Sequence, residues 1–61
     1  MRVTYSTIRR IKINAPMSER EKVNNWLDKN NYYVKRSGPK LINASQVDVT
    51  KLFIIAEKRI K

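Results

Sequence analysis

The spacing of apolar residues predicts a β-strand near the amino end of the chain. Between Val3 and Ile13 the odd positions are largely apolar or β-branched, whereas the even positions are mostly polar. This period of two places alternate side chains on opposite faces of a sheet. Ile8 and Arg9 break the phase, which predicts a bulge within one continuous strand. The Asn-Ala-Pro sequence after Ile13 is expected to end it.

A helical pattern follows, from about Ser18 to Lys29. Ser18 and Glu21 have the spacing of a capping box, in which each side chain satisfies a backbone N–H at the start of a helix. Apolar residues recur at i, i+3 and i+4 and predict one narrow stripe that packs in the core. They are Val23, Trp26 and Leu27. The Asn-Asn pair after Lys29 is expected to supply the left-handed residue that ends the helix.

The second half of the chain predicts a β-hairpin. Tyr32–Arg36 has the composition of a short strand, and the Ser-Gly-Pro sequence that follows is expected to end it. Lys40–Gln46 is mostly polar and predicts a long hairpin connection. Val47–Ile60 then forms the last apolar segment of the chain.

This last segment fits two interpretations. As a strand it has apolar residues on both faces, which is typical of the central strand of a sheet. As a helix it has an apolar stripe from Val49 to Ile60, and the protein would then resemble a winged or excisionase-type DNA binder. The Phe-Ile-Ile sequence is β-prone and follows a hairpin-like segment, so the strand is favoured.

These elements predict a single α+β domain over residues 1–61, with the chain order β-α-β-β. We expect a three-stranded sheet of order 1-3-2 with the helix packed on one face. Alternation then directs three apolar side chains toward the helix, namely Ile11, Ile13 and Val34. Four polar or aromatic side chains point toward the opposite, uncovered face: Arg10, Lys12, Tyr33 and Lys35.

The distribution of charge gives this uncovered face a predicted role. The chain has 14 Lys and Arg against 5 Asp and Glu, a net charge of +9 on 61 residues. Between Met17 and Asn30 acids and bases cancel, so the excess lies on the other segments. Such a confined excess is typical of a surface that contacts a polyanion.

We therefore predict a small, non-enzymatic nucleic-acid-binding protein, for DNA or RNA. It would be an accessory or regulatory factor, for example of a virus or mobile element. Lys and Arg would contact phosphates, and Tyr33 or Phe53 would stack on a base. The candidate binding residues are Arg9, Arg10, Lys12, Tyr33, Lys35, Arg36, Lys40 and Lys58.

A protein-interaction module is the alternative prediction. The two-sided apolarity of the last segment and the small core expected of so short a chain favour a homodimer or an inhibitor that docks on an acidic partner protein. Phe53, Ile55 and Tyr33 would be its buried anchors.

Composition argues against other classes of function. The chain has no His and no Cys, so imidazole and thiolate chemistry and disulfides are absent. Its single Gly cannot form a glycine-rich phosphate loop. We expect no catalytic residues, metal, cofactor or small-molecule substrate. The longest apolar run, Leu52–Ala56, is far shorter than the about 20 residues of a membrane-spanning helix, and a cytoplasmic location is expected.

Overall fold

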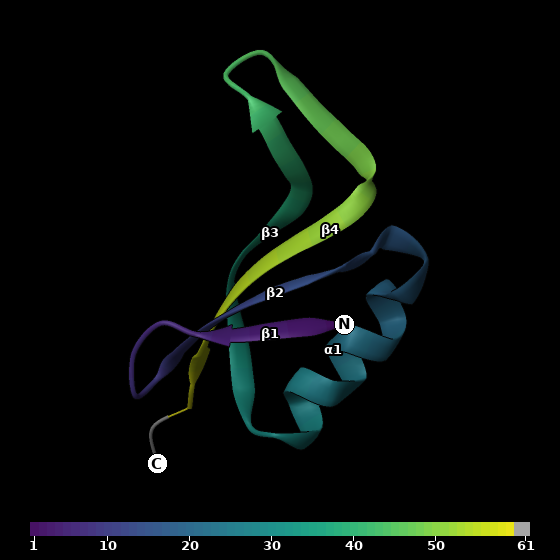
Figure 1. The fold of residues 1–61 in the computed structure, drawn as a ribbon. Coiled ribbons are helices and arrows are strands. Elements are labelled where there is room, and N and C mark those ends of the chain that lie inside the picture. Colours follow the sequence, from purple (N-terminus) through teal and green to yellow (C-terminus); the bar gives the residue numbers. More distant parts are fainter. Residues whose placement is uncertain (60–61) are drawn as a thin grey trace.

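The fold is a four-stranded antiparallel sheet with one α-helix on one of its faces (Figure 1). The computed structural model describes residues 1–59. The strands are β1 (Arg2–Tyr5), β2 (Arg10–Pro16), β3 (Tyr32–Asn43) and β4 (Gln46–Lys58), in the order β1-β2-β4-β3. A short 3₁₀ helix, η1 (Met17–Glu19), and the helix α1 (Arg20–Lys29) connect β2 to β3. The predicted α+β class with a single helix is confirmed.

The predicted first strand is a β-hairpin, so the prediction of three strands in order 1-3-2 is wrong. β1 pairs antiparallel with β2, and the chain reverses in the loop between Tyr5 and Arg10. The hydroxyl of Thr7 holds this loop by accepting the backbone N–H groups of Arg9 at 3.3 Å and Arg10 at 2.9 Å. The break in phase at Ile8 therefore marks a reversal of the chain rather than a bulge, and Ile8 itself is 99% exposed.

The sequence correctly predicted how the helix ends but not how it begins. The predicted capping box does not form, because η1 takes up Ser18 and the α-helix starts at Arg20 without a side-chain cap. At the other end the prediction is confirmed. Asn30 donates from its backbone and side chain to the carbonyl of Trp26, and Asn31 has a φ of 66°. This left-handed residue turns the chain into β3.

The last two strands form a hairpin that is much longer than predicted. β3 continues through Gly38 and Pro39 to Asn43, and only Ala44 and Ser45 separate it from β4. Lys40–Gln46 is therefore mostly strand and not a long connection. Pro39 is tolerated because β3 is an edge strand, where a missing N–H costs no ladder hydrogen bond on the open side.

The last segment is a strand, as favoured, and it lies between β2 and β3. The helical alternative is wrong, and the winged arrangement that depended on it is excluded. Ile60, the predicted end of this segment, lies outside the described residues. β4 pairs with both neighbours in antiparallel register. Its apolar residues alternate between the helix-covered face, where Leu52, Ile54 and Ala56 are buried, and the other face, where Phe53 and Ile55 are half-buried.

The core lies between the sheet and α1. Its buried residues come from both layers: Ile11, Ile13, Ala15, Val23, Leu27, Tyr32, Leu52, Ile54 and Ala56. Trp26 packs against this cluster as predicted, and its ring stacks on that of Tyr32 with centroids 5.9 Å apart. Val34 was expected to face the helix but is 42% exposed, because β3 is the edge strand and lies at the border of the covered face.

The outer part of the β3–β4 hairpin projects beyond the helix (Figure 1). We call residues 39–51 the distal hairpin. Not one of its residues is buried, and Leu41 and Val49 are 70% and 68% exposed. A register shift between Pro39 and Lys40 marks the place where the hairpin leaves the sheet. Within residues 1–59, no helix has the length and apolarity to cross a membrane.

Candidate functional site

The face of the sheet that points away from α1 is the candidate site, and we call it the open face. Strand register arranges its side chains in three cross-strand rows. The first row is Arg10, Glu57 and Tyr33; the second is Thr4, Lys12, Ile55 and Arg36; the third is Arg2, Asn14, Phe53 and Gly38. On β2 and β4 the row residues alternate with buried core residues, so the rows lie on the uncovered side.

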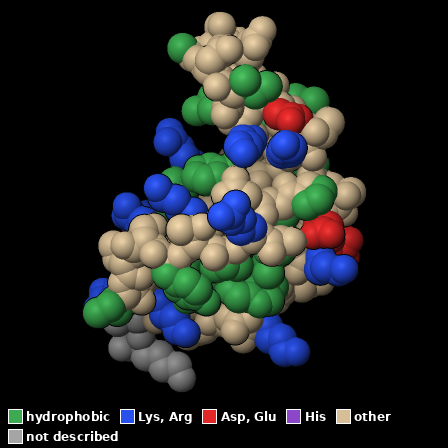
Figure 2. Space-filling model, in the orientation of Figure 1, with side chains coloured by type: hydrophobic (Ala, Val, Ile, Leu, Met, Phe, Trp, Pro, Cys, Tyr) green, Lys and Arg blue, Asp and Glu red, His purple; other side chains and the backbone are tan. Residues whose placement is uncertain are grey.

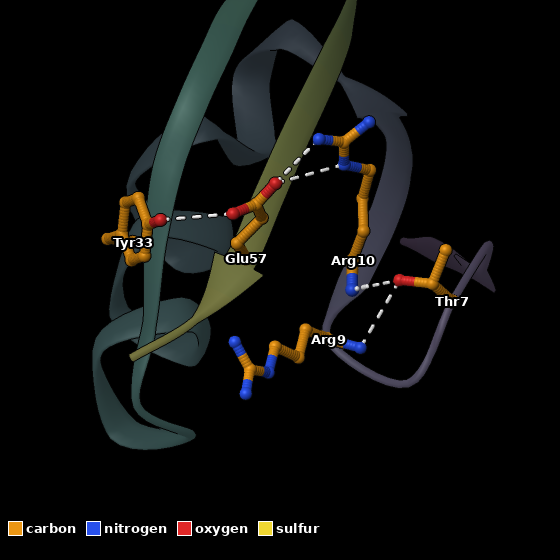
Figure 3. Close-up of polar contacts among 5 residues, drawn as sticks. All are labelled: Thr7, Arg9, Arg10, Tyr33 and Glu57. Carbon is orange, nitrogen blue, oxygen red and sulfur yellow. Dashed lines mark hydrogen bonds and ion pairs between the residues drawn. The ribbon is translucent and has the colours of Figure 1, made fainter. Parts of the chain in front are cut away.

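A polar network occupies the first row (Figure 3). The guanidinium of Arg10 donates to Oε2 of Glu57 from Nη2 at 2.6 Å and from Nε at 3.1 Å. The hydroxyl of Tyr33 donates to Oε1 of the same carboxylate at 3.0 Å. Two predicted binding residues, Arg10 and Tyr33, therefore have an internal partner.

The network shifts the ionisation of both acidic members. The hydrogen bonds from Arg10 and then Tyr33 lower the pKa of Glu57. The hydrogen bond to Glu57 raises the pKa of the Tyr33 phenol, against the weaker opposing effect of the nearby Arg10 and Arg9 charges. The side chain of Arg9 runs from the β1–β2 loop toward the end of β4 (Figure 3). The charges of Arg10 and Glu57 thus compensate each other in the first row, at one end of the open face.

The second row carries charge that no acid compensates. Lys12 and Arg36 lie on opposite sides of Ile55, across two strand spacings of about 4.8 Å each. No salt bridge within residues 1–59 involves either side chain, and both are exposed. Ile55 between them is half-buried. This row therefore offers two cations separated by an apolar side chain.

A bulge in β3 adds a further cation. The register shifts between Val34 and Arg36, so Lys35 has no partner on β4. Such a bulge re-aims the side chains of the bulged strand. The ammonium of Lys35 lies 5.8 Å from the centre of the Tyr33 ring, beside the first row. Strict alternation would have separated Lys35 from Arg36, whereas the bulge brings both to the open face.

A hollow of about 450 Å³ lies over the third row. It is bounded by Asn14, Phe53, the segment from Arg36 to Lys40, and Leu41. The distal hairpin forms one of its walls, and the half-buried Phe53 ring forms part of its floor. Gly38 opposite Phe53 has no side chain, and a Cβ placed there would meet nothing within 4 Å.

The remaining predicted residues lie at the margins of the open face or beyond it. Lys40 lies opposite Asp48 in the strand register of the distal hairpin and borders the hollow. Lys58 lies opposite the buried Tyr32, with its ammonium 5.1 Å from the centre of that ring, and so belongs to the helix-covered side. The structure therefore gathers all the candidate binding residues except Lys58 on or beside one face.

Basic side chains lie where the distal hairpin meets the body of the molecule, whereas the hairpin itself carries scattered hydrophobic side chains (Figure 2). Sequence reasoning missed Arg2, Asn14 and Gly38 as members of the site. A Gly within a strand is a signal of close approach by a ligand or another backbone, and it was interpreted as a turn. Arg2 lies opposite Asn14 because β1 and β2 form a hairpin. The break in phase at Ile8 was interpreted as a bulge, so this pairing was not predicted.

The open face provides cations, two aromatic rings, one carboxylate and one carboxamide. Within residues 1–59, no three His, Cys, Asp or Glu side chains are grouped as a metal site would require. No protein-family model, curated protein or solved structure matches the chain. The function is therefore inferred from the site itself.

Proposed function

We propose that the protein is a small, non-enzymatic nucleic-acid-binding protein that contacts phosphates through its open face. It acts inside the cell as an accessory or regulatory factor. The observation that carries this proposal is the second row, where Lys12 and Arg36 flank an apolar centre without an acidic partner among residues 1–59.

The arrangement of charge supports a polyanion as the ligand. Lys12, Lys35, Arg36 and Arg2 all belong to the open face or its bulge, and Glu57 is the one acid in the three rows. Phosphate contacts by Lys and Arg release counterions, which gives an affinity that falls steeply with salt. A charged surface that only keeps the protein soluble would have acids and bases interspersed, as on α1.

The apolar centre of the face supports nucleic acid over a simple inorganic anion. Phe53 and Ile55 are half-buried, so their exposed parts are available to the faces of bases while the surrounding cations hold the backbone. Exposed sheet faces that combine aromatic rings with basic residues are a common platform for single-stranded nucleic acid.

A pair of charge-reversal variants tests this proposal. Lys12→Glu with Arg36→Glu alters the second row, and Arg20→Glu with Lys22→Glu makes the same change in net charge on exposed positions of α1. Binding of labelled DNA and RNA oligonucleotides is measured by fluorescence anisotropy over a salt series. We expect the open-face variant to weaken binding and to reduce the slope of log K against log salt by about two.

The helix variant is the control and should keep most of the wild-type slope. Equal losses in the two variants would show that net charge alone, and not the open face, governs binding. Absence of binding by the wild-type protein at low salt would contradict the proposal altogether.

A protein partner is the second candidate, because the distal hairpin is unusually apolar. Leu41, Ile42, Val47 and Val49 are between 45% and 70% exposed. These side chains, with Phe53 and Ile55, would meet a second copy or an acidic protein. Sedimentation of wild type and of Leu41→Ser with Val49→Ser tests the homodimer: a concentration-dependent dimer that the double variant abolishes would support it. A monomer at high concentration removes it.

A further inference from the structure

We infer that the hollow over the third row binds an unpaired nucleobase, which makes single-stranded DNA or RNA the ligand of the open face. This inference rests on the proposed function and specifies its substrate. The volume of the hollow, about 450 Å³, lies within the range of sites that hold small organic molecules. The residues that line it include an aromatic ring for a base, a carboxamide for the edge of the base, and cations for the phosphates.

An aromatic ring is available at the floor of the hollow. Phe53 belongs to the central strand β4, and its backbone is paired on both sides, with Asn14 and Gly38. Its position is therefore fixed before any ligand arrives. A preorganised ring of this kind stacks on any base, because every base has a π-face.

Gly38 leaves part of the hollow free of a side chain. Any other residue at this position of β3 would direct a side chain onto the open face beside Phe53, where a Cβ has open space around it. Gly is a poor strand former, so its presence inside a strand is unfavourable for the fold alone. The space that it leaves is the place where a planar base fits beside the Phe53 ring.

Polar groups of the right kind border this space. Arg36 and Lys40 line the hollow and supply positive charge for the phosphates on either side of a bound base. Asn14 is half-buried and presents both a donor and an acceptor to the edge of a base. Electrostatic complementarity therefore favours a nucleotide over an uncharged apolar ligand or a segment of another protein.

A base must be unstacked to enter the hollow. Within a duplex both faces of each base are covered by its neighbours, and an exposed sheet can reach only the backbone and the groove edges. An unpaired strand can rotate a base onto Phe53 at low cost. Duplex binding would then use only the phosphate contacts of the second row.

The experiment compares probes that differ in whether an unpaired base is present; the single-stranded probes have the same number of phosphates. The probes are a labelled oligothymidylate of about 12 nucleotides, the same length with abasic sites, the oligouridylate, and the dA·dT duplex. Wild type should bind the oligothymidylate roughly tenfold or more above the abasic probe and the duplex. Comparable binding of oligouridylate assigns the site to either nucleic acid, and weaker or stronger binding reports the combined effect of the sugar and the thymine methyl group; both results support the inference.

Gly38→Val tests the hollow in the protein. Val is a good strand former and introduces no charge, so the variant should fold, which circular dichroism verifies. It should lose the preference for oligothymidylate over the abasic probe while keeping the salt slope. Asn25→Leu adds an uncharged apolar side chain at an exposed position of α1, away from the open face, and is the control.

The failure of this inference is distinguishable from that of the proposed function. If wild type binds the abasic probe and the duplex as tightly as oligothymidylate, and Lys12→Glu with Arg36→Glu still weakens binding, the hollow binds no base and the phosphate surface stands. If no probe binds at low salt, both proposals fail. A homodimer that Gly38→Val dissociates would assign the hollow to a second copy and overturn the inference.

Discussion

At the scale of single residues, Glu57 decides which cations of the open face are available. Its carboxylate accepts hydrogen bonds from Arg10 and Tyr33, so the charge of Arg10 is compensated within the protein. Lys12 and Arg36 in the next row have no such partner among residues 1–59. The proposed phosphate-binding part of the face therefore begins at the second row, next to Glu57.

Removing this carboxylate should strengthen nucleic-acid binding. In Glu57→Gln the amide can still accept a hydrogen bond, but Arg10 regains an uncompensated charge beside the open face. We expect a higher affinity for oligonucleotides and a salt slope that is steeper by up to about one. Fluorescence anisotropy measures both. Glu21→Gln on α1 makes the same change in net charge on the helix-bearing side, and an equal gain in this control would refute the role of Glu57.

The same carboxylate should make stability depend on acidity. Because hydrogen bonds from Arg10 and Tyr33 lower the pKa of Glu57, its ionised form is favoured by folding. The stabilisation is present above the ordinary glutamate pKa of about 4.3 and is lost as the pH falls through the lowered pKa of the folded protein. Thermal unfolding by circular dichroism across this range measures the effect.

Glu57→Gln should show a shallower loss of stability on the acid side than wild type. Part of the loss should remain in both proteins, since Thr50 lowers the pKa of Asp48 through its side-chain and backbone hydrogen bonds. If Glu57→Gln lost stability at low pH as steeply as wild type, the network would contribute nothing to the stability of the fold.

At the scale of elements, periodicity predicted which side chains are buried but not where the chain reverses. Ile11 and Ile13 are buried as the period of two indicates, and β4 is a strand with apolar residues on both faces. The loop before Arg10 contains no Gly, Pro or Asn, and the break in phase at Ile8, the signal that marks it, is equally compatible with a bulge. Gly38 and Pro39 resemble a turn, yet an edge strand accommodates both.

The end of α1 offers a test of one element boundary. Asn31 has a φ of 66°, in the left-handed region that most residues with a Cβ avoid at a cost of about 1–2 kcal/mol. Asn31→Val should lower the free energy of unfolding by about that amount, because a β-branched side chain is especially unfavourable there. Asn31→Gly should be neutral within a few tenths of a kcal/mol. Urea denaturation measures both, and equal stabilities of the Val and Gly variants would contradict the argument.

At the scale of the whole molecule, the candidate site depends on register, which the sequence does not reveal. The basic residues were predicted to converge on an uncovered face, and the structure places all of them there or beside it except Lys58. The hollow was not predicted, because it requires Asn14, Phe53 and Gly38 to be aligned across β2, β4 and β3. Such alignment is set by pairing between segments far apart in the chain, and a shift of one residue would send each side chain to the other face.

The shape of the molecule concentrates its stability in a small region. Its extents are 38 × 22 × 15 Å, and no residue from 33 to 51 is buried. The distal hairpin therefore adds exposed surface without adding to the core. The sheet and α1 must hold the fold through the nine residues of one cluster.

A single truncation in this cluster should consequently unfold much of the protein. Ile54 is 1% exposed at the centre of β4, and Ile54→Ala should cost about 2–5 kcal/mol from lost burial and the cavity left behind. A chain of 61 residues has a total stability of only about 3–9 kcal/mol. Val49→Ala, in the same strand but 68% exposed, should change stability by less than about 0.5 kcal/mol. Urea denaturation measures the stability of both variants. Comparable losses would show that the distal hairpin is part of the cooperative core, and a small loss in Ile54→Ala would contradict the dependence of the fold on this cluster.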